Sequence, residues 1–101
     1  MLFEVETPLG FQVRTTVGYW ELITTVKHPM IRGREADVKA TLSHPDEVRL
    51  SKSDPKVFLF YRADGEQRWV CAVTKQLNGE GFLITAYRTG AIKEGTMVWH
   101  K

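Results

Sequence analysis

The stretch VFLFYRADG, residues 57–65, decides the fold. Its first five residues, Val57 to Tyr61, are apolar on both faces of an extended chain, which predicts a central strand of a sheet. Asp64-Gly65 follows, and this dipeptide is a strong signal for a tight hairpin turn. The next apolar run, Trp69 to Thr74, is therefore expected to return as an antiparallel neighbour.

The alternation of apolar runs and turns continues on both sides of this stretch. After the turn at Asn78-Gly79, residues 82–87 form another run that is apolar on both faces. Residues 48–50 alternate apolar and charged side chains, which predicts a half-exposed strand. Residues 97–99 predict a short last strand. Together these runs make four or five consecutive strands joined by short turns.

Two helices are predicted ahead of these strands. From Val17 to Lys27 the apolar residues recur at helical spacing, Thr15 or Thr16 can cap the start, and Pro29 ends the helix. A second helix is expected from Arg32 to Leu42.

Residues 2–6 and 11–15 alternate apolar and polar side chains around Pro8-Leu9-Gly10, and so predict an N-terminal hairpin. The whole order predicts an α+β fold. An N-terminal hairpin is followed by two helices packed on one face of a four- to five-stranded antiparallel sheet.

The composition favours one domain, residues 1–101, in a reducing compartment. The apolar fraction is 43% and the charged fraction 26%, which is typical of a folded domain. A single cysteine, Cys71, excludes an intrachain disulfide and a four-cysteine zinc site, and favours the cytoplasm. Neither a signal peptide nor an apolar run of about 18 residues is present, so we expect no membrane segment.

The charge and the histidines restrict the expected ligands. The net charge of +2 and the pI of about 8.8 permit contact with phosphates without demanding it. The three histidines lack metal-ligand spacing, and no glycine-rich phosphate loop precedes a helix. We therefore expect neither a metal nor a cofactor.

Five stretches of the chain carry a resemblance through their order and spacing. They are Trp20…Lys27-His28-Pro29, Arg32-Gly33-Arg34-Glu35, Leu42-Ser43-His44-Pro45-Asp46-Glu47-Val48, Phe58-Leu59-Phe60-Tyr61-Arg62 and Leu83-Ile84-Thr85-Ala86-Tyr87. In this order the chain resembles the barnase–EndoU–colicin–RelE-like nuclease superfamily, and in particular its small phage-associated and bacterial domains, over about residues 19–90. The resemblance implies a metal-independent RNase, with RNA and a cognate antitoxin protein as partners.

Cleavage of RNA without a metal needs a base, an acid and donors that stabilise charge on the phosphate. His28 is the first candidate, because it ends a helix where its ring can face the sheet and where the resemblance places a functional histidine. The alternative is a histidine that satisfies helix carbonyls. Arg62 would share a face with Phe58 and Phe60 and hold a phosphate, or else extend into solvent beside the turn.

Thr85 and Tyr87 share one face of the 82–87 strand, and the superfamily often places hydroxyl groups on a late strand. Tyr87 could donate to a phosphate oxygen or stack on a base; the alternative for both is packing on the sheet. Arg32 and Arg34 open the second helix, an unfavourable place for a cation, which suits either phosphate binding or a solvated face.

Arg88 and Lys93 would extend a basic rim that binds RNA, or remain ordinary surface charges. His44 and His100 are expected to be structural, and Cys71 is expected in the core.

Three hypotheses remain open from the sequence. The first is a metal-independent endoribonuclease with His28, Arg62, Thr85 and Tyr87 as its catalytic group. The second is a non-catalytic module that binds RNA or protein on the same scaffold. The third is an interaction protein, such as a homodimer formed through the hairpin, because a second apolar sheet face needs a cover.

Overall fold

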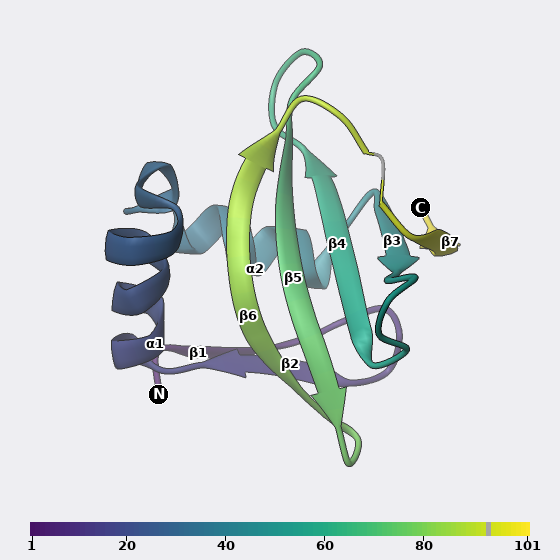
Figure 1. Ribbon diagram of the computed structural model, residues 1–101, viewed down its shortest axis with the longest axis horizontal. Helices are drawn as coiled ribbons and strands as arrows, with labels where there is room; N and C mark the ends of the chain where they lie inside the picture. Colours follow the sequence, from purple (N-terminus) through teal and green to yellow (C-terminus); the bar gives the residue numbers. More distant parts are fainter. Residues whose placement is uncertain (93) are drawn as a thin grey trace.

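A curved sheet forms the body of the protein in the computed structural model, which describes residues 1–92 and 94–101 (Figure 1). Within these residues seven strands pair in the order β1-β2-β6-β5-β4-β3-β7. The strands are β1 (Phe3–Glu6), β2 (Gln12–Thr15), β3 (Glu47–Leu50), β4 (Val57–Ala63), β5 (Trp69–Leu77), β6 (Glu80–Thr89) and β7 (Thr96–His100).

The α+β class and the antiparallel run of strands are confirmed, but the predicted sheet is too small. Strands β3, β4, β5 and β6 are consecutive antiparallel neighbours, and β7 pairs antiparallel with β3. The predicted N-terminal hairpin β1–β2 is present and joins the same sheet. Its strand β2 runs parallel to β6 over Val13–Arg14 and Gly81–Phe82, so the sheet is mixed.

The helical segments lie close to the positions predicted from the capping residues and prolines. The first helical segment is continuous from α1 (Val17–Leu22) into a π-helical turn, η1 (Ile23–Lys27), and Thr16 Oγ1 caps it by accepting from the Tyr19 N–H at 3.1 Å. A 3-10 turn, η2 (Pro29–Ile31), comes next. The second helix, α2 (Glu35–Ser43), begins three residues later than predicted. Gly33, at φ +79°, turns the chain before it.

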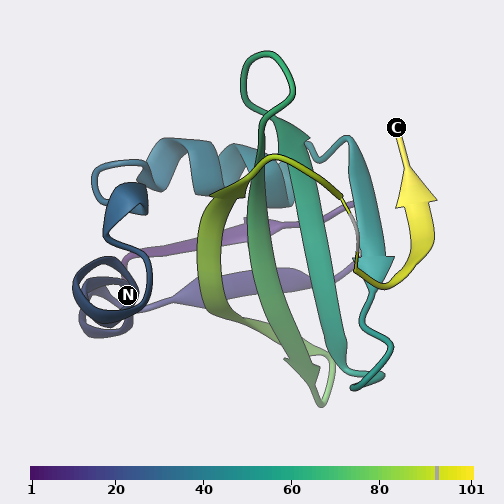
Figure 2. The same ribbon diagram turned by 45° about the horizontal axis from the view of Figure 1, so that its top comes forward.

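Only one of the two helical segments covers a face of the sheet. Helix α2 lies behind β4 and β5, together with the β1–β2 hairpin that crosses the sheet on the same side (Figures 1 and 2). The segment α1–η1–η2 stands beside β6 instead, along the part of that strand that β2 leaves unpaired. The prediction that both helices pack on one face is therefore wrong for the first helix.

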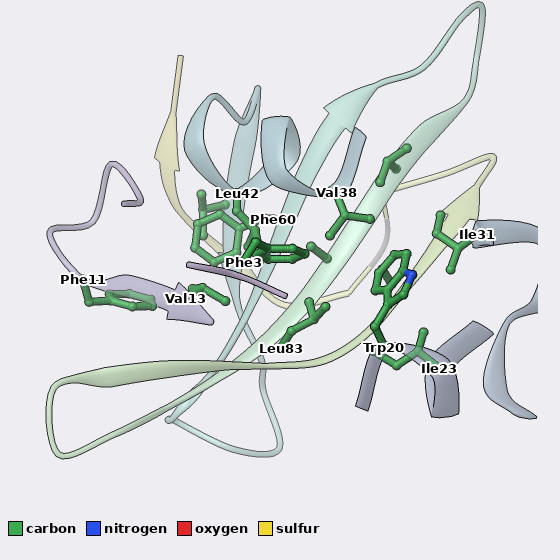
Figure 3. Packing of buried hydrophobic residues seen from close by; sticks show 14 residues of the cluster. Phe3, Phe11, Val13, Trp20, Ile23, Ile31, Val38, Leu42, Phe60 and Leu83 are labelled. Atoms are coloured by element: carbon green, nitrogen blue, oxygen red, sulfur yellow. The ribbon is translucent and has the colours of Figure 1, made fainter. Parts of the chain in front are cut away.

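The core lies between the inner sheet face, the hairpin and the helices. Figure 3 shows side chains from all three parts pointing into one cluster. The ring centroid of Phe11 lies 5.5 Å from that of Phe58 and 6.3 Å from that of Phe60, and Phe3 meets Trp20 edge to face at 6.5 Å. Aromatic packing of this kind ties the hairpin to the central strands.

The outer sheet face carries a second, smaller cluster. Leu59, Tyr61 and Cys71 are buried there, and Ile92 packs against them from the segment between β6 and β7. Figure 2 shows this segment passing in front of β5 and β4. The cover that the sequence led us to expect on this face therefore comes, in part, from the chain itself.

None of the described helices combines the length and the hydropathy needed to cross a bilayer.

Gly81 is required where β2 meets β6, because a Cβ there would lie 2.7 Å from the Gln12 carbonyl oxygen and 2.9 Å from the Phe11 ring. We expect Gly81→Ala to lower the free energy of unfolding by about 1–3 kcal/mol, the usual cost of overpacking. The measurement is urea unfolding followed by circular dichroism.

Gly18→Ala is the matched control for Gly81→Ala, because Gly18 lies in α1 and a Cβ there meets nothing within 4 Å. It should raise stability by about 0.5–1 kcal/mol, since alanine favours helix more than glycine does. Equal effects of the two substitutions would contradict the close approach at Gly81.

Candidate functional site

His28 lies between η1 and η2, and its ring faces β6. Its backbone leaves the helical region (φ −143°, ψ 81°), and its N–H donates to the Ile23 carbonyl at 2.7 Å, which closes the π turn. The half-buried imidazole packs against Tyr87, with ring centroids 5.2 Å apart and planes tilted by 40°. The structure therefore brings together two of the predicted catalytic residues.

Strand β6 contains a β-bulge at the point where the segment α1–η1 packs against it. Val73 pairs with Thr85, but Thr74 pairs with Leu83, so Ile84 is an extra residue without an opposite partner on β5. Bulges bend a strand and redirect its polar groups, and they occur often beside functional sites. Here the bulge makes the Ile84 carbonyl available at the edge of the sheet.

Two side chains of the helical segment bind the Ile84 carbonyl. Tyr19 Oη donates to it at 2.8 Å, and Lys27 Nζ donates to it at 3.2 Å and to Tyr19 Oη at 3.1 Å. Because Lys27 immediately precedes His28, these bonds fix the imidazole relative to β6. The bulge thus positions the candidate site.

The imidazole lies in the wall of a surface hollow of about 440 Å³, which we call the His28 hollow. Among the residues that the structure describes, three cationic side chains line the same hollow and no carboxylate does. Its wall includes Lys27, His28, Met30, Arg68, Tyr87 and Arg88. An arrangement of this kind attracts an anion, and arginine and lysine both bind phosphate groups in proteins.

One of these cations is restrained by a carboxylate. Arg88 Nε donates to Asp64 Oδ2 at 2.7 Å, and Arg34 bridges Asp64 Oδ1 (2.9 Å) and Asp37 (2.9 Å). Burial raises the pKa of the Asp64 carboxyl, but the hydrogen bonds and charges of Arg34 and Arg88 outweigh burial and hold this pKa below its usual value. Lys27 and Arg68 form no ion pair among the described residues. Their hydrogen bonds go to uncharged acceptors, Tyr19 Oη and the Ile84 carbonyl for Lys27 and the Gln67 carbonyl for Arg68, so their charges are not neutralised.

Tyr87 is held in the hydroxyl form. Burial, and then the neighbouring Cys71, raise the pKa of its phenol well above the ordinary value. Tyr87 therefore keeps its proton at neutral pH, so its phenol can donate a hydrogen bond and does not act as a base.

The other predicted site residues lie elsewhere. Arg62 shares the inner face with Phe58 and Phe60, as expected, but its Nη1 donates to the His44 carbonyl at 2.6 Å, where it caps the C-terminus of α2. Arg32 is exposed in the turn before α2 and lines a separate hollow.

Thr85 shares the outer face with Tyr87, as expected, and its buried Oγ1 makes no hydrogen bond within the described chain. Lys93, predicted to belong to the basic rim, lies outside the described residues.

The sequence reasoning did not single out Lys27, Arg68 or Tyr19. Lys27 had a signal, because it is adjacent to His28 in the helix end. Arg68 precedes a strand next to a turn, where a charged residue is ordinary, and the role of Tyr19 depends on the bulge at Ile84. Neither of these two could be identified from spacing.

No group of three or more histidine, cysteine or acidic side chains lies close enough to hold a metal ion within residues 1–92 and 94–101. Comparisons of the chain with protein-family models, with curated proteins and with solved structures find no match.

The low pKa of the Asp64 carboxyl makes its ion pairs a source of stability that depends on pH. Because folding lowers this pKa, the contribution is complete above the unfolded-state value of about 3.9 and is lost as the pH falls through the folded-state value. We expect Asp64→Asn to be less stable than the wild type at pH 7, and the difference to shrink below pH 4. Urea unfolding at pH 7, 4 and 3 measures it; a difference independent of pH would contradict the assignment.

Proposed function

We propose that the protein is an endoribonuclease of the toxin type, which cleaves RNA at the His28 hollow without a metal ion. The observation that supports this proposal is the contact between His28 and Tyr87 in a hollow lined by Lys27, Arg68 and Arg88. A proton-transferring group, a hydroxyl donor and phosphate-binding cations thus share one wall. The resemblance to the barnase–EndoU–colicin–RelE-like superfamily, from the order of sequence stretches, points to the same chemistry.

The proposed reaction is an internal transesterification. The neutral imidazole of His28 takes the proton of the ribose 2′-hydroxyl, and the 2′-oxygen attacks phosphorus. The bond from phosphorus to the 5′-oxygen breaks, and the imidazolium returns its proton to that oxygen. The products are a 2′,3′-cyclic phosphate and a free 5′-hydroxyl, so protons and bonds balance. Histidine is suited to both transfers, because it changes charge near neutral pH.

The other side chains of the hollow stabilise charge in this scheme. Tyr87 donates from its phenol to a phosphate oxygen, and Lys27 and Arg68 neutralise the charge that develops on phosphorus. Arg88 contributes further positive charge, which its ion pair with Asp64 reduces. Arg62, Arg32 and Arg34 have no place in this scheme, because none of them lines the His28 hollow.

A toxin of this type needs a protein that silences it in the cytoplasm. The rim of the hollow is suited to such a partner, because Val26 and Met30 beside it are 70% and 78% exposed. Exposed apolar side chains next to unpaired cations favour a segment that carries both apolar and acidic residues. We propose that a cognate antitoxin covers the hollow in this way.

A non-catalytic RNA-binding module is the second candidate. The observation that favours it is the Arg88–Asp64 pair, which reduces the excess positive charge of a chain whose net charge is only +2. Such a module would bind RNA with a steep salt dependence and release no product.

The test is cleavage of single-stranded RNA by the purified protein in EDTA, with the ends identified by mass spectrometry. We expect 2′,3′-cyclic phosphate ends, and we expect His28→Ala to lower the rate by about 10²-fold or more, the usual contribution of an acid–base group. Tyr87→Phe removes the hydroxyl and keeps the ring, so its cleavage rate measures the contribution of the hydroxyl alone.

His44→Ala is the matched control for His28→Ala. His44 is an exposed histidine at the end of α2, where its ring contacts Ser43, and it does not line the His28 hollow. Equal activity of the His28 and His44 variants would remove His28 from the mechanism. RNA binding without any cleavage would favour the second candidate.

A further inference from the structure

Another hollow opens where β2 leaves β6 and the chain turns into α1. Its volume is about 620 Å³, and we call it the Phe82 hollow. Figure 1 shows the arrangement that forms it, with β2 meeting the lower part of β6 and α1 standing beside that strand. The volume is within the usual range for small-ligand sites. The wall includes Arg14, Tyr19, Lys75, Leu77, Phe82 and Ile84.

Most of this wall is apolar. Leu83 is buried, Phe82 and Ile84 are half-buried, and Leu77 is 39% exposed. Apolar groups that line a concave surface gain free energy when a ligand removes them from water. The Phe82 hollow therefore favours a ligand with an apolar part.

Two cations lie on either side of Phe82. Lys75 pairs with Phe82 across β5 and β6, and Phe82 pairs with Arg14 across β6 and β2, so the three side chains form one row on the outer face. The guanidinium carbon of Arg14 lies 4.7 Å from the centroid of the Phe82 ring. The backbones of β2 and β5 are about 10 Å apart, two strand spacings, so the long side chains of Arg14 and Lys75 can converge on one group.

The charge of the Phe82 hollow is positive. Among the residues that the structure describes, no carboxylate lines it. Glu80 and Asp54 lie outside the wall, where Glu80 pairs with Arg14 at 3.4 Å and Asp54 pairs with Lys75 at 3.4 Å. Both ion pairs are exposed to solvent, and such pairs are weak. An anion that enters the hollow can therefore compete for both cations.

We infer that the Phe82 hollow binds a small amphiphile with a carboxylate head and an unbranched alkyl chain, in the class of medium-chain fatty acids. The head lies between Arg14 and Lys75, because a carboxylate matches both cations. The chain lies along the apolar wall. The inference goes beyond the proposed nuclease activity, because the Phe82 hollow and the His28 hollow have no lining residue in common.

The choice of an alkyl chain follows from the surfaces that the wall offers. Leu77, Leu83 and Ile84 are aliphatic and present no flat ring on which an aromatic ligand could stack. The ring of Phe82 is already in contact with the guanidinium of Arg14. A flexible chain can follow such a wall, and every methylene that it buries adds to the affinity.

The first experiment titrates octanoate, acetate and octyltrimethylammonium into the protein and follows the backbone amide signals by NMR. We expect octanoate to shift the signals of residues around the Phe82 hollow, and acetate to leave them unchanged. The cationic amphiphile should bind at least about 10-fold more weakly than octanoate, because it loses the attraction of both cations. Equal binding of the two octyl compounds, or octanoate shifts centred elsewhere, would overturn the inference.

The length of the chain gives a second measurement on the same protein. From hexanoate to octanoate the affinity should rise about 4-fold for each methylene, which is the size of the hydrophobic effect for one buried methylene. An affinity that does not depend on chain length would contradict the placement of the chain in the hollow.

Lys75→Met removes the charge and keeps most of the side chain. We expect it to weaken octanoate binding by about 5-fold or more, the size of a hydrogen bond to a charged group. Lys52→Met is the matched control, because it makes the same change of net charge at an exposed position between β3 and β4, outside the hollow. An equal loss in both variants would show a general attraction of charge and would overturn the site.

Leu77→Ser tests the apolar wall without relying on the cations. Leu22→Ser is its matched control, because Leu22 is 42% exposed in α1 and lines a separate hollow. We expect octanoate binding to weaken about 3-fold or more in the Leu77 variant only, since a buried apolar contact is lost. Unchanged binding in Leu77→Ser would refute the inference. Octanoate binding at the hollow of a protein that cleaves no RNA would uphold it while the nuclease proposal fell.

Discussion

The hydrogen bonds of Tyr19 and Lys27 to the Ile84 carbonyl join the first helical segment to strand β6. They exist because β6 contains one residue more than β5 needs, and because β2 pairs with β6 over only two positions before it diverges. The bulge turns a carbonyl outward at a free edge, and Tyr19 and Lys27 bind it. The place of His28, the His28 hollow and the exposed rim near Met30 depend on this attachment.

Most of the elements could be predicted from local signals in the sequence. Apolar runs separated by Asp64-Gly65 and Asn78-Gly79 located the central strands, and Pro29 marked the end of the first helical segment. The attachment of the hairpin to β6 could not be predicted, because it consists of two paired residues far apart in the chain, near Gly81. The position of the first helix beside the sheet follows from that attachment, and so it was also missed.

The candidate site could be predicted only in part. The pairing of His28 with Tyr87 was expected, and so was the face on which Arg62 lies. The alternation of side chains along a strand predicts the sheet face on which each side chain lies, but not the residue that it contacts. Arg62 contacts the His44 carbonyl at the end of α2. Of the cations that line the hollow, Lys27 precedes His28 in the sequence and Arg88 was predicted as part of a basic rim, whereas Arg68 is brought next to the imidazole only by the fold.

Cys71 lies at the centre of the outer face, fully buried in the middle strand of the sheet, with the pKa of its thiol raised to about 12. A thiol reagent attacks only the thiolate, and it needs access, so the native protein resists alkylation on both grounds. Labelling of this single sulfur therefore requires that β4, β5 and β6 separate from what covers them. The rate of labelling reports how often that part of the molecule opens, without any introduced probe.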